Sequence, residues 1–195
     1  MVGFLRQIGL VLVLAAPFGC ATLSDREAGE LEQAAASRSP FVGQSAPFFS
    51  LPNQADQQVR LQEFQGRWVV LYFYPADDTP GCTCQATEFT RLIGRYDRLD
   101  AAVLGVSPNT PQSHRLFRQK HGIGITLLSD LDHAVAKKYG AWNKMGWQDD
   151  RIGRIVRSTV LINPQGQIAY HWPEVMPKGH ANRVRRRLEN LKNHP

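Results

Sequence analysis

The chain has 195 residues, a length that suggests one domain with additional segments. With 43% hydrophobic and 21% charged residues it can bury a core without cross-links, and three cysteines are too few for a disulfide scaffold. The net charge of +6 is not accompanied by a nucleic-acid-binding motif, so we expect no nucleic-acid partner and interpret the charge as a general surface property.

The first 20 residues have the pattern of an export signal. Arg6 precedes an apolar run over residues 8–18, which suits a signal-peptide core and is too short to span a bilayer comfortably. Gly19 and Cys20 follow this run and resemble a bacterial lipobox, in which Cys20 becomes the lipidated first residue. The resemblance implies an outer-membrane lipoprotein, because Ala21 is not the aspartate that retains lipoproteins in the inner membrane. An ordinary cleaved signal or a hydrophobic anchor is the alternative, and all of these place the domain in the oxidising periplasm.

Composition divides the chain into three parts. Residues 1–20 form the signal segment, and residues 21–45 are polar and rich in Ala and Ser, as a tether would be. We expect the folded domain to span residues 46–195.

Strands and helices alternate through the domain. A continuous apolar run over residues 67–74 predicts a strand that is buried on both faces. The later elements expected are a strand at 101–107, a helix after the N-cap Thr110, a strand at 125–130, a helix ending at Gly140, a hairpin of 158–162 with 167–172, and a closing helix with the apolar stripe Ala181, Val184, Leu188 and Leu191. Residues 143–155 lack periodicity and are expected to form a loop near the site. The alternation predicts an α/β fold with a mixed central sheet flanked by helices.

The segment TPGCTC, residues 79–84, contains two of the three cysteines. Thr79 is a good helix N-cap and Pro80 is favoured at the first helical position, so Cys82 should lie in the first turn of a helix. Backbone N–H groups and the positive end of the helix dipole favour a thiolate there, so we expect the pKa of Cys82 to be lowered.

The spacing Pro75-x-x-x-Thr79-x-x-Cys82 resembles the active-site signature of the peroxiredoxins. The segment TPGCTCQATEF is similar to the subgroup called peroxiredoxin Q or bacterioferritin comigratory protein. Further segments resemble that subgroup in the same order, namely ITLLSDLDHAVAKKYGAW, RSTVLINPQGQI and KGHANRVRRRLENL. The likeness covers about residues 44–192 and implies a thioredoxin-like fold.

The resemblance also implies roles for four residues. Cys82 would be the peroxidatic nucleophile, Thr79 would offer its hydroxyl to the peroxide, Pro75 would cover the sulfur, and Arg157 would be the catalytic arginine. A guanidinium stays protonated and can stabilise both the thiolate and the peroxide oxygens. The implied substrate is hydrogen peroxide or an alkyl hydroperoxide, the implied product on the enzyme is a sulfenic acid, and no cofactor or metal is expected.

The chain departs from the subgroup in its second cysteine. Many members have a resolving cysteine five residues after the first, where this chain has Thr87, and residues 108–140 contain no cysteine. Cys84 is two helical positions from Cys82, which places the two side chains about 200° apart around the helix. A bond between them would need the first turn to unwind. We therefore expect a one-cysteine mechanism, with a thioredoxin-like protein or a small thiol as the reductant, and the bond between Cys82 and Cys84 remains the alternative.

Two other functions fit parts of the sequence. A thiol–disulfide oxidoreductase on the same fold usually needs Cys-x-x-Cys, whereas this chain has Cys-x-Cys. A membrane-tethered binding module without activity would not need the complete set of Pro75, Thr79, Cys82 and Arg157. Both alternatives are therefore weaker than the peroxidase.

Overall fold

The computed structural model describes residues 39–144 and 153–194, together with Glu30. The predicted signal segment, the lipidation site Cys20 and most of the predicted tether lie outside the described residues.

A five-stranded mixed sheet forms the centre of the domain, with the strand order β5-β4-β3-β8-β9. Its strands are β3 (Trp68–Phe73), β4 (Ala101–Ser107), β5 (Thr126–Ser129), β8 (Ser158–Ile162) and β9 (Ile168–Trp172). Neighbours β3, β4 and β5 run parallel, whereas β8 is antiparallel to both β3 and β9. The predicted α/β fold with a mixed sheet is confirmed, and all five strands occur close to where the sequence predicts them.

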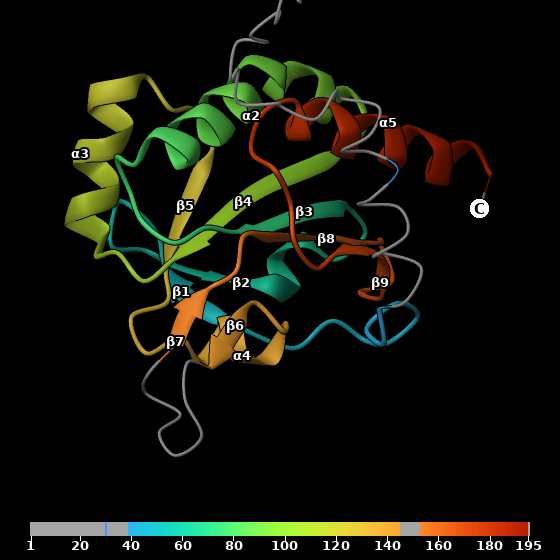
Figure 1. Ribbon diagram of the computed structural model, residues 1–195. Coiled ribbons are helices and arrows are strands. Elements are labelled where there is room, and N and C mark those ends of the chain that lie inside the picture. The colour runs from blue at the N-terminus through green and yellow to red at the C-terminus, as the bar shows by residue number, and fades with distance from the viewer. Residues whose placement is uncertain (1–29, 31–38, 145–152, 195) are drawn as a thin grey trace, which may run out of the picture.

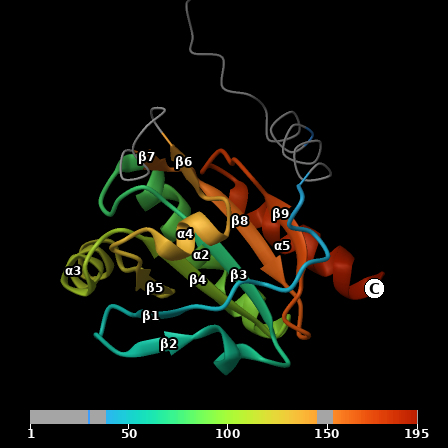
Figure 2. The ribbon, with the colours of Figure 1, turned by 90° about the horizontal axis from the view of Figure 1, so that it is seen from below.

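Helices cover both faces of this sheet (Figure 1). They are α2 (Pro80–Arg98), α3 (Pro111–His121), α4 (Ala134–Lys138) and α5 (His180–Asn193). Helices α2 and α5 pack against each other on one face, and α3 lies beside the edge strand β5. Seen from below, α4 and the small hairpin of β1 (Ser50–Pro52) and β2 (Gln58–Arg60) lie in front of the other face (Figure 2). Among the described helices, none combines the length and apolar character needed to cross a membrane.

Aromatic side chains fill the core beneath α2. The ring of Tyr72 on β3 stacks on Phe89 of α2, with 4.9 Å between the ring centroids. Gly105 is the register partner of Tyr72 on the neighbouring strand β4. A Cβ atom at Gly105 would lie 2.6 Å from the Tyr72 hydroxyl oxygen, so only glycine leaves room for this phenol.

The expected loop over residues 143–155 is wrong at both of its ends. Strands β6 (Trp142–Lys144) and β7 (Gly153–Ile155) pair antiparallel, with Trp142 opposite Ile155. Both of these side chains pack into the core on the α4 side of the sheet, which stabilises the pairing. Three-residue strands are too short to produce the alternation by which a strand is recognised.

The first described residues already contact the domain. The Gly43 N–H donates to the Ile168 carbonyl, Ser45 forms a bridge with Gln167, and Phe41 packs on the core of the α4 face. Residues 41–45, which the sequence analysis assigns to the tether, therefore contact the folded domain and lie just before its predicted start at Ala46.

A buried histidine makes the fold sensitive to acid. His171 on β9 is 2% exposed, its Nδ1 lies 2.6 Å from the Ser39 hydroxyl, and burial lowers its pKa from 6.5 to about 4. As the pH falls, the unfolded chain takes up this proton first, so the stabilisation is complete above pH ~6.5 and is lost toward pH ~4.

We expect the free energy of unfolding to fall by about 2 kcal/mol between pH 7 and pH 5 through His171 alone. Urea unfolding at the two pH values measures the change. A His171→Asn variant can keep a hydrogen bond with Ser39 but cannot titrate, so it should lose about 2 kcal/mol less than the unmodified protein over this range. Equal losses in the two proteins would contradict the prediction.

Candidate active site

The register of the central strands brings the predicted site residues together. Phe73, the last residue of β3, pairs with Ser158, the first residue of β8. The chain leaving β3 enters the loop that leads to α2, and Arg157 immediately precedes Ser158. The loop before α2 and Arg157 therefore meet where β3 ends and β8 begins, although they are far apart in the sequence.

Cys82 lies in the first turn of α2, as predicted. Helix α2 begins at Pro80 after Thr79 in an extended conformation, and its first intrahelical bond joins the Thr83 N–H to the Thr79 carbonyl. The side chain of Cys82 is 1% exposed and belongs to the core beneath the helix. The thiol is therefore shielded from bulk water at the end of the helix where amide N–H groups are unpaired within the helix.

Arg157 supplies a positive charge directly to this sulfur. Its Nη2 donates to the Cys82 Sγ at 3.3 Å, and its Nη1 donates to the Gln85 Oε1 at 2.6 Å. The Arg157 carbonyl also accepts a bond from the Val175 N–H. Because the guanidinium is a rigid fork, the fully buried Gln85 fixes the orientation in which the other prong reaches Cys82.

The sequence analysis assigns no role in the site to Gln85, so its contact with Arg157 was not predicted. The spacing from Cys82 to Gln85 is three residues, which puts both side chains on one face of a helix. That spacing was the available signal, and it needed only the assumption that Arg157 approaches the same face.

Tyr72 lies beneath the site as an uncharged neighbour. Burial raises the pKa of its phenol well above the ordinary value, and the nearby Cys82 sulfur raises it further. Among the described residues its hydroxyl has no hydrogen-bond partner. Tyr72 therefore contributes apolar shielding on the core side of Cys82 and no charge.

Thr79 occupies the predicted N-cap position but bonds differently from expectation. Its side chain accepts no hydrogen bond from the first turn of α2, and its hydroxyl donates instead to the Ala76 carbonyl at 3.2 Å. The bond folds the loop back on itself, and the hydroxyl oxygen keeps its acceptor capacity. Pro75 is exposed and lies two residues after the end of β3, so its role as a cover over the sulfur stays a prediction.

Cys84 points to different surroundings from Cys82. Its Sγ lies 3.9 Å from the Glu88 Oε1 on the next turn of α2, while Cys82 contacts Arg157. Burial and then the Glu88 carboxylate raise the pKa of Cys84, so it stays a neutral thiol at neutral pH. Both cysteines are free in this structure, and the helix that carries them is regular.

Comparison with known proteins identifies the family. The model of the AhpC/TSA family matches residues 42–171, which is most of the domain. The chain belongs to the AhpC/TSA family. It is a peroxiredoxin, and its activity is that of a thiol-dependent peroxidase.

Individual relatives of this peroxiredoxin agree with the family match. A putative peroxiredoxin of Helicobacter pylori strain J99 is 42% identical over 151 residues, covering 77% of this chain and 97% of the relative. The peroxiredoxin Bcp of Bacillus subtilis is 37% identical over 151 residues, covering 77% and 96%. Both matches leave about a quarter of this chain outside the common domain.

Solved structures have the same fold. The bacterioferritin comigratory protein of Xanthomonas campestris superposes with a TM-score of 0.69 at 34% identity, covering 73% of this chain and 91% of that one. Peroxidoxin BcpB of Mycobacterium tuberculosis gives a TM-score of 0.70 at 26% identity, covering 77% and 97%. The thioredoxin-like fold expected from the sequence is confirmed.

Within the part of the chain that the structure describes, no three His, Cys, Asp or Glu side chains gather as ligands for an ion. The contacts of Cys82 are with an arginine, which suits an anionic sulfur rather than a bound cation.

Proposed function

We propose that Cys82 is the peroxidatic cysteine of this peroxiredoxin and that it reduces hydrogen peroxide or alkyl hydroperoxides by a one-cysteine mechanism. The observation that carries the proposal is the 3.3 Å contact between the Arg157 guanidinium and the buried Cys82 sulfur at the start of α2. The comparisons add support, because the study of the related Xanthomonas campestris protein concerns alkyl peroxide reduction.

The reaction is a displacement at oxygen. The Cys82 thiolate attacks the terminal peroxide oxygen, an S–O bond forms, and the O–O bond breaks. The departing hydroxide or alkoxide takes up a proton and leaves as water or alcohol, while Cys82 becomes a sulfenic acid. Arg157 stabilises the thiolate before attack and the developing negative charge on the departing oxygen, and the Thr79 hydroxyl orients the peroxide.

External thiols then restore the enzyme. The first thiol condenses with the sulfenic acid, releasing water and forming a mixed disulfide, and a second thiol displaces Cys82 from it. Cys84 is a poor internal partner because it is a neutral thiol on another side of the helix, beside the Glu88 carboxylate. The Thr87 hydroxyl is bonded to the Thr83 and Cys84 carbonyls and offers no thiol.

Mass spectrometry of the protein after one equivalent of peroxide tests this proposal. We expect a dimedone adduct on Cys82, which reports a sulfenic acid, and an unmodified Cys84. A loss of two hydrogens with both cysteines joined would show that Cys84 resolves Cys82 and would overturn the one-cysteine mechanism. Modification of Cys84 alone would overturn the assignment of Cys82.

We also propose that the chain is exported and anchored in the outer membrane through a lipid on Cys20. The support comes from the sequence, namely the apolar run over residues 8–18 followed by Gly19 and Cys20. The family match begins at residue 42, so this segment lies outside the peroxiredoxin domain. Lipidation would use the Cys20 thiol, leaving Cys82 and Cys84 as the two thiols of the mature chain.

Metabolic labelling with a tagged fatty acid tests the anchor. We expect the label to appear on the protein in the outer-membrane fraction and to disappear in a Cys20→Ser variant, which should fractionate elsewhere. A Cys84→Ser variant is the matched control and should remain labelled. Unlabelled protein in the soluble fraction would refute the anchor without affecting the peroxidase assignment.

A further inference from the structure

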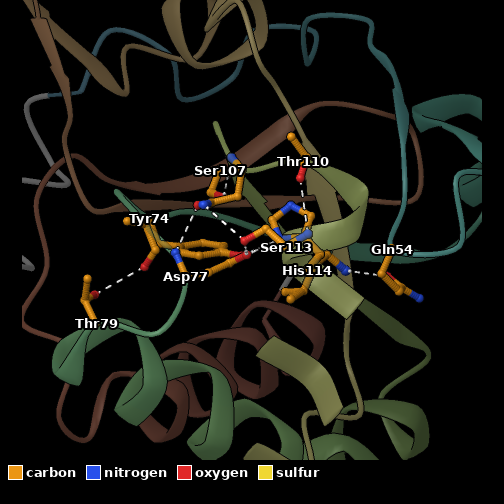
Figure 3. A network of polar contacts seen from close by, with 11 residues as sticks. Gln54, Tyr74, Asp77, Thr79, Ser107, Thr110, Ser113 and His114 are labelled. Carbon is orange, nitrogen blue, oxygen red and sulfur yellow. Dashed lines mark hydrogen bonds and ion pairs between the residues drawn. The ribbon is translucent and has the colours of Figure 1, made fainter. Parts of the chain in front are cut away.

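The loop between β3 and α2 is held to α3 by a buried network of polar side chains (Figure 3). The central member is Asp77, two residues before Thr79. Its carboxylate accepts hydrogen bonds from the Tyr74 hydroxyl at 2.7 Å, from the Ser113 hydroxyl at 2.7 Å and from the His114 Nδ1 at 2.9 Å. Its backbone N–H donates to the Asn109 Oδ1 at 3.0 Å.

Asp77 and His114 are both withdrawn from water. Their side chains are 4% and 0% exposed, respectively. Burial alone would raise the pKa of the Asp77 carboxyl, but the hydrogen bonds from His114, Ser113 and Tyr74 outweigh burial and lower the pKa. Asp77 is therefore a buried carboxylate whose two oxygens receive three donors. Because a carboxylate only accepts, the His114 Nδ1 carries the hydrogen of their shared bond.

Helix α3 is itself firmly anchored. The Thr110 hydroxyl oxygen accepts the Ser113 N–H as an N-cap, and Arg115 donates to the Gln54 carbonyl of the turn after β1. Phe117 is 2% exposed and packs in the core with Phe89 of α2. A loop fixed to α3 is therefore fixed to the whole domain.

We propose that Asp77 and His114 form a positioning pair for the peroxidase reaction: by pinning the loop to α3, the pair sets the place of Thr79 and of the first turn that carries Cys82. The inference rests on the proposed function of Cys82. Between Asp77 and Cys82 there are only four residues, one of which is the Thr79 whose hydroxyl bonds back to Ala76. A shift of the loop therefore moves the peroxide-binding hydroxyl and the first turn of α2 relative to Arg157, which directly precedes β8 and is bonded to Gln85 in the next turn of α2.

Neighbouring Asp78 provides a matched control. It adopts a positive φ of 60°, is half exposed, and contacts Lys120 and His121 at the other end of α3. Exposed ion pairs of this kind contribute little, so Asp78→Asn should leave the reaction nearly unchanged. Asparagine also tolerates the left-handed conformation. Asp77→Asn removes the same charge but replaces a buried carboxylate oxygen with an amide NH2 group, which is a donor that faces other donors.

His114 offers a second matched pair of variants. Asparagine can place a donor near the position of Nδ1. Leucine has nearly the same size and shape as asparagine but has no donor. The Nε2 of His114 has no partner among the described residues, so asparagine sacrifices no second hydrogen bond. The comparison of His114→Asn with His114→Leu therefore isolates the bond to Asp77 from the change in volume.

The test compares two reactions of Cys82 in each variant. Stopped-flow measurement gives the rate constant with hydrogen peroxide, and alkylation by iodoacetamide with peptide mass spectrometry gives the reactivity of the same sulfur toward a reagent that does not need Thr79. We expect His114→Leu and Asp77→Asn to lower the ratio of the peroxide rate to the alkylation rate by roughly 10- to 100-fold. His114→Asn and Asp78→Asn should stay within about threefold of the unmodified protein.

A merely structural role would not change this ratio, because loss of stability alone does not discriminate between the two reagents in the folded fraction. An unchanged ratio in His114→Leu overturns the inference, as does an equal loss in His114→Asn or in Asp78→Asn. If His114→Leu does not fold, the two aspartate variants carry the same test. If Cys82 of the unmodified protein does not react with peroxide, the proposed function itself is overturned. This outcome is distinct from an unchanged ratio in the variants.

Discussion

A Cys82→Ser variant should reduce peroxide at no more than about a thousandth of the rate of the unmodified protein. The serine hydroxyl fits the same buried place in the first turn of α2, but it is not ionised beside Arg157 and is a poor nucleophile toward oxygen. Peroxide consumption in the presence of excess dithiothreitol measures the effect. The fold should be retained, because the substitution changes one atom in the core.

The matched control for this variant is Cys84→Ser, two residues further along the same helix. Cys84 is in contact with Glu88 rather than with Arg157, so its replacement should leave the rate within about twofold. A Cys84→Ser protein that reduces peroxide once and then stops would contradict the one-cysteine mechanism.

The second large effect is expected at Arg157. Replacement by methionine keeps much of the aliphatic volume and removes the cation beside Cys82, so we expect the rate constant with peroxide to fall by about 100- to 1000-fold. Lysine should restore only part of the loss, because its ammonium cannot contact the Cys82 sulfur and the Gln85 oxygen as a fork does. Stopped-flow kinetics at several peroxide concentrations measures both variants.

Arg154→Met is the control for the loss of charge. Arg154 is exposed on β7, three residues before Arg157, and it carries the same charge without reaching the sulfur. Its variant should react at close to the normal rate. Equal losses in the two methionine variants would show that Arg157 acts through overall charge rather than through its contact with Cys82.

Local rules explain why the first turn of α2 could be predicted from the sequence. A threonine before a proline marks a helix start, so the position of Cys82 follows from its immediate neighbours. The side-chain bond of Thr79 could not be predicted in this way, because its choice of the Ala76 carbonyl depends on how the loop is held by α3.

The role of Arg157 could not be predicted from the neighbouring residues alone. It lies 75 residues from Cys82, and nothing in its own surroundings distinguishes it from a surface arginine before a strand. Resemblance to the family identified it, and the pairing of β3 with β8 explains it. The contact between Asp77 and His114 was missed for the same reason, because it requires the placement of α3 against a loop 37 residues away.

The central position of β8 has a consequence for the making of the protein. β8 lies between β3 and β9, so Arg157, which directly precedes β8, reaches Cys82 only after the chain has been synthesised through β8 and β8 has paired with β3. A partly folded or truncated chain already contains Cys82 but lacks its cation. The contact between Arg157 and the Cys82 sulfur is therefore completed only by the pairing of two strands that lie far apart in the sequence.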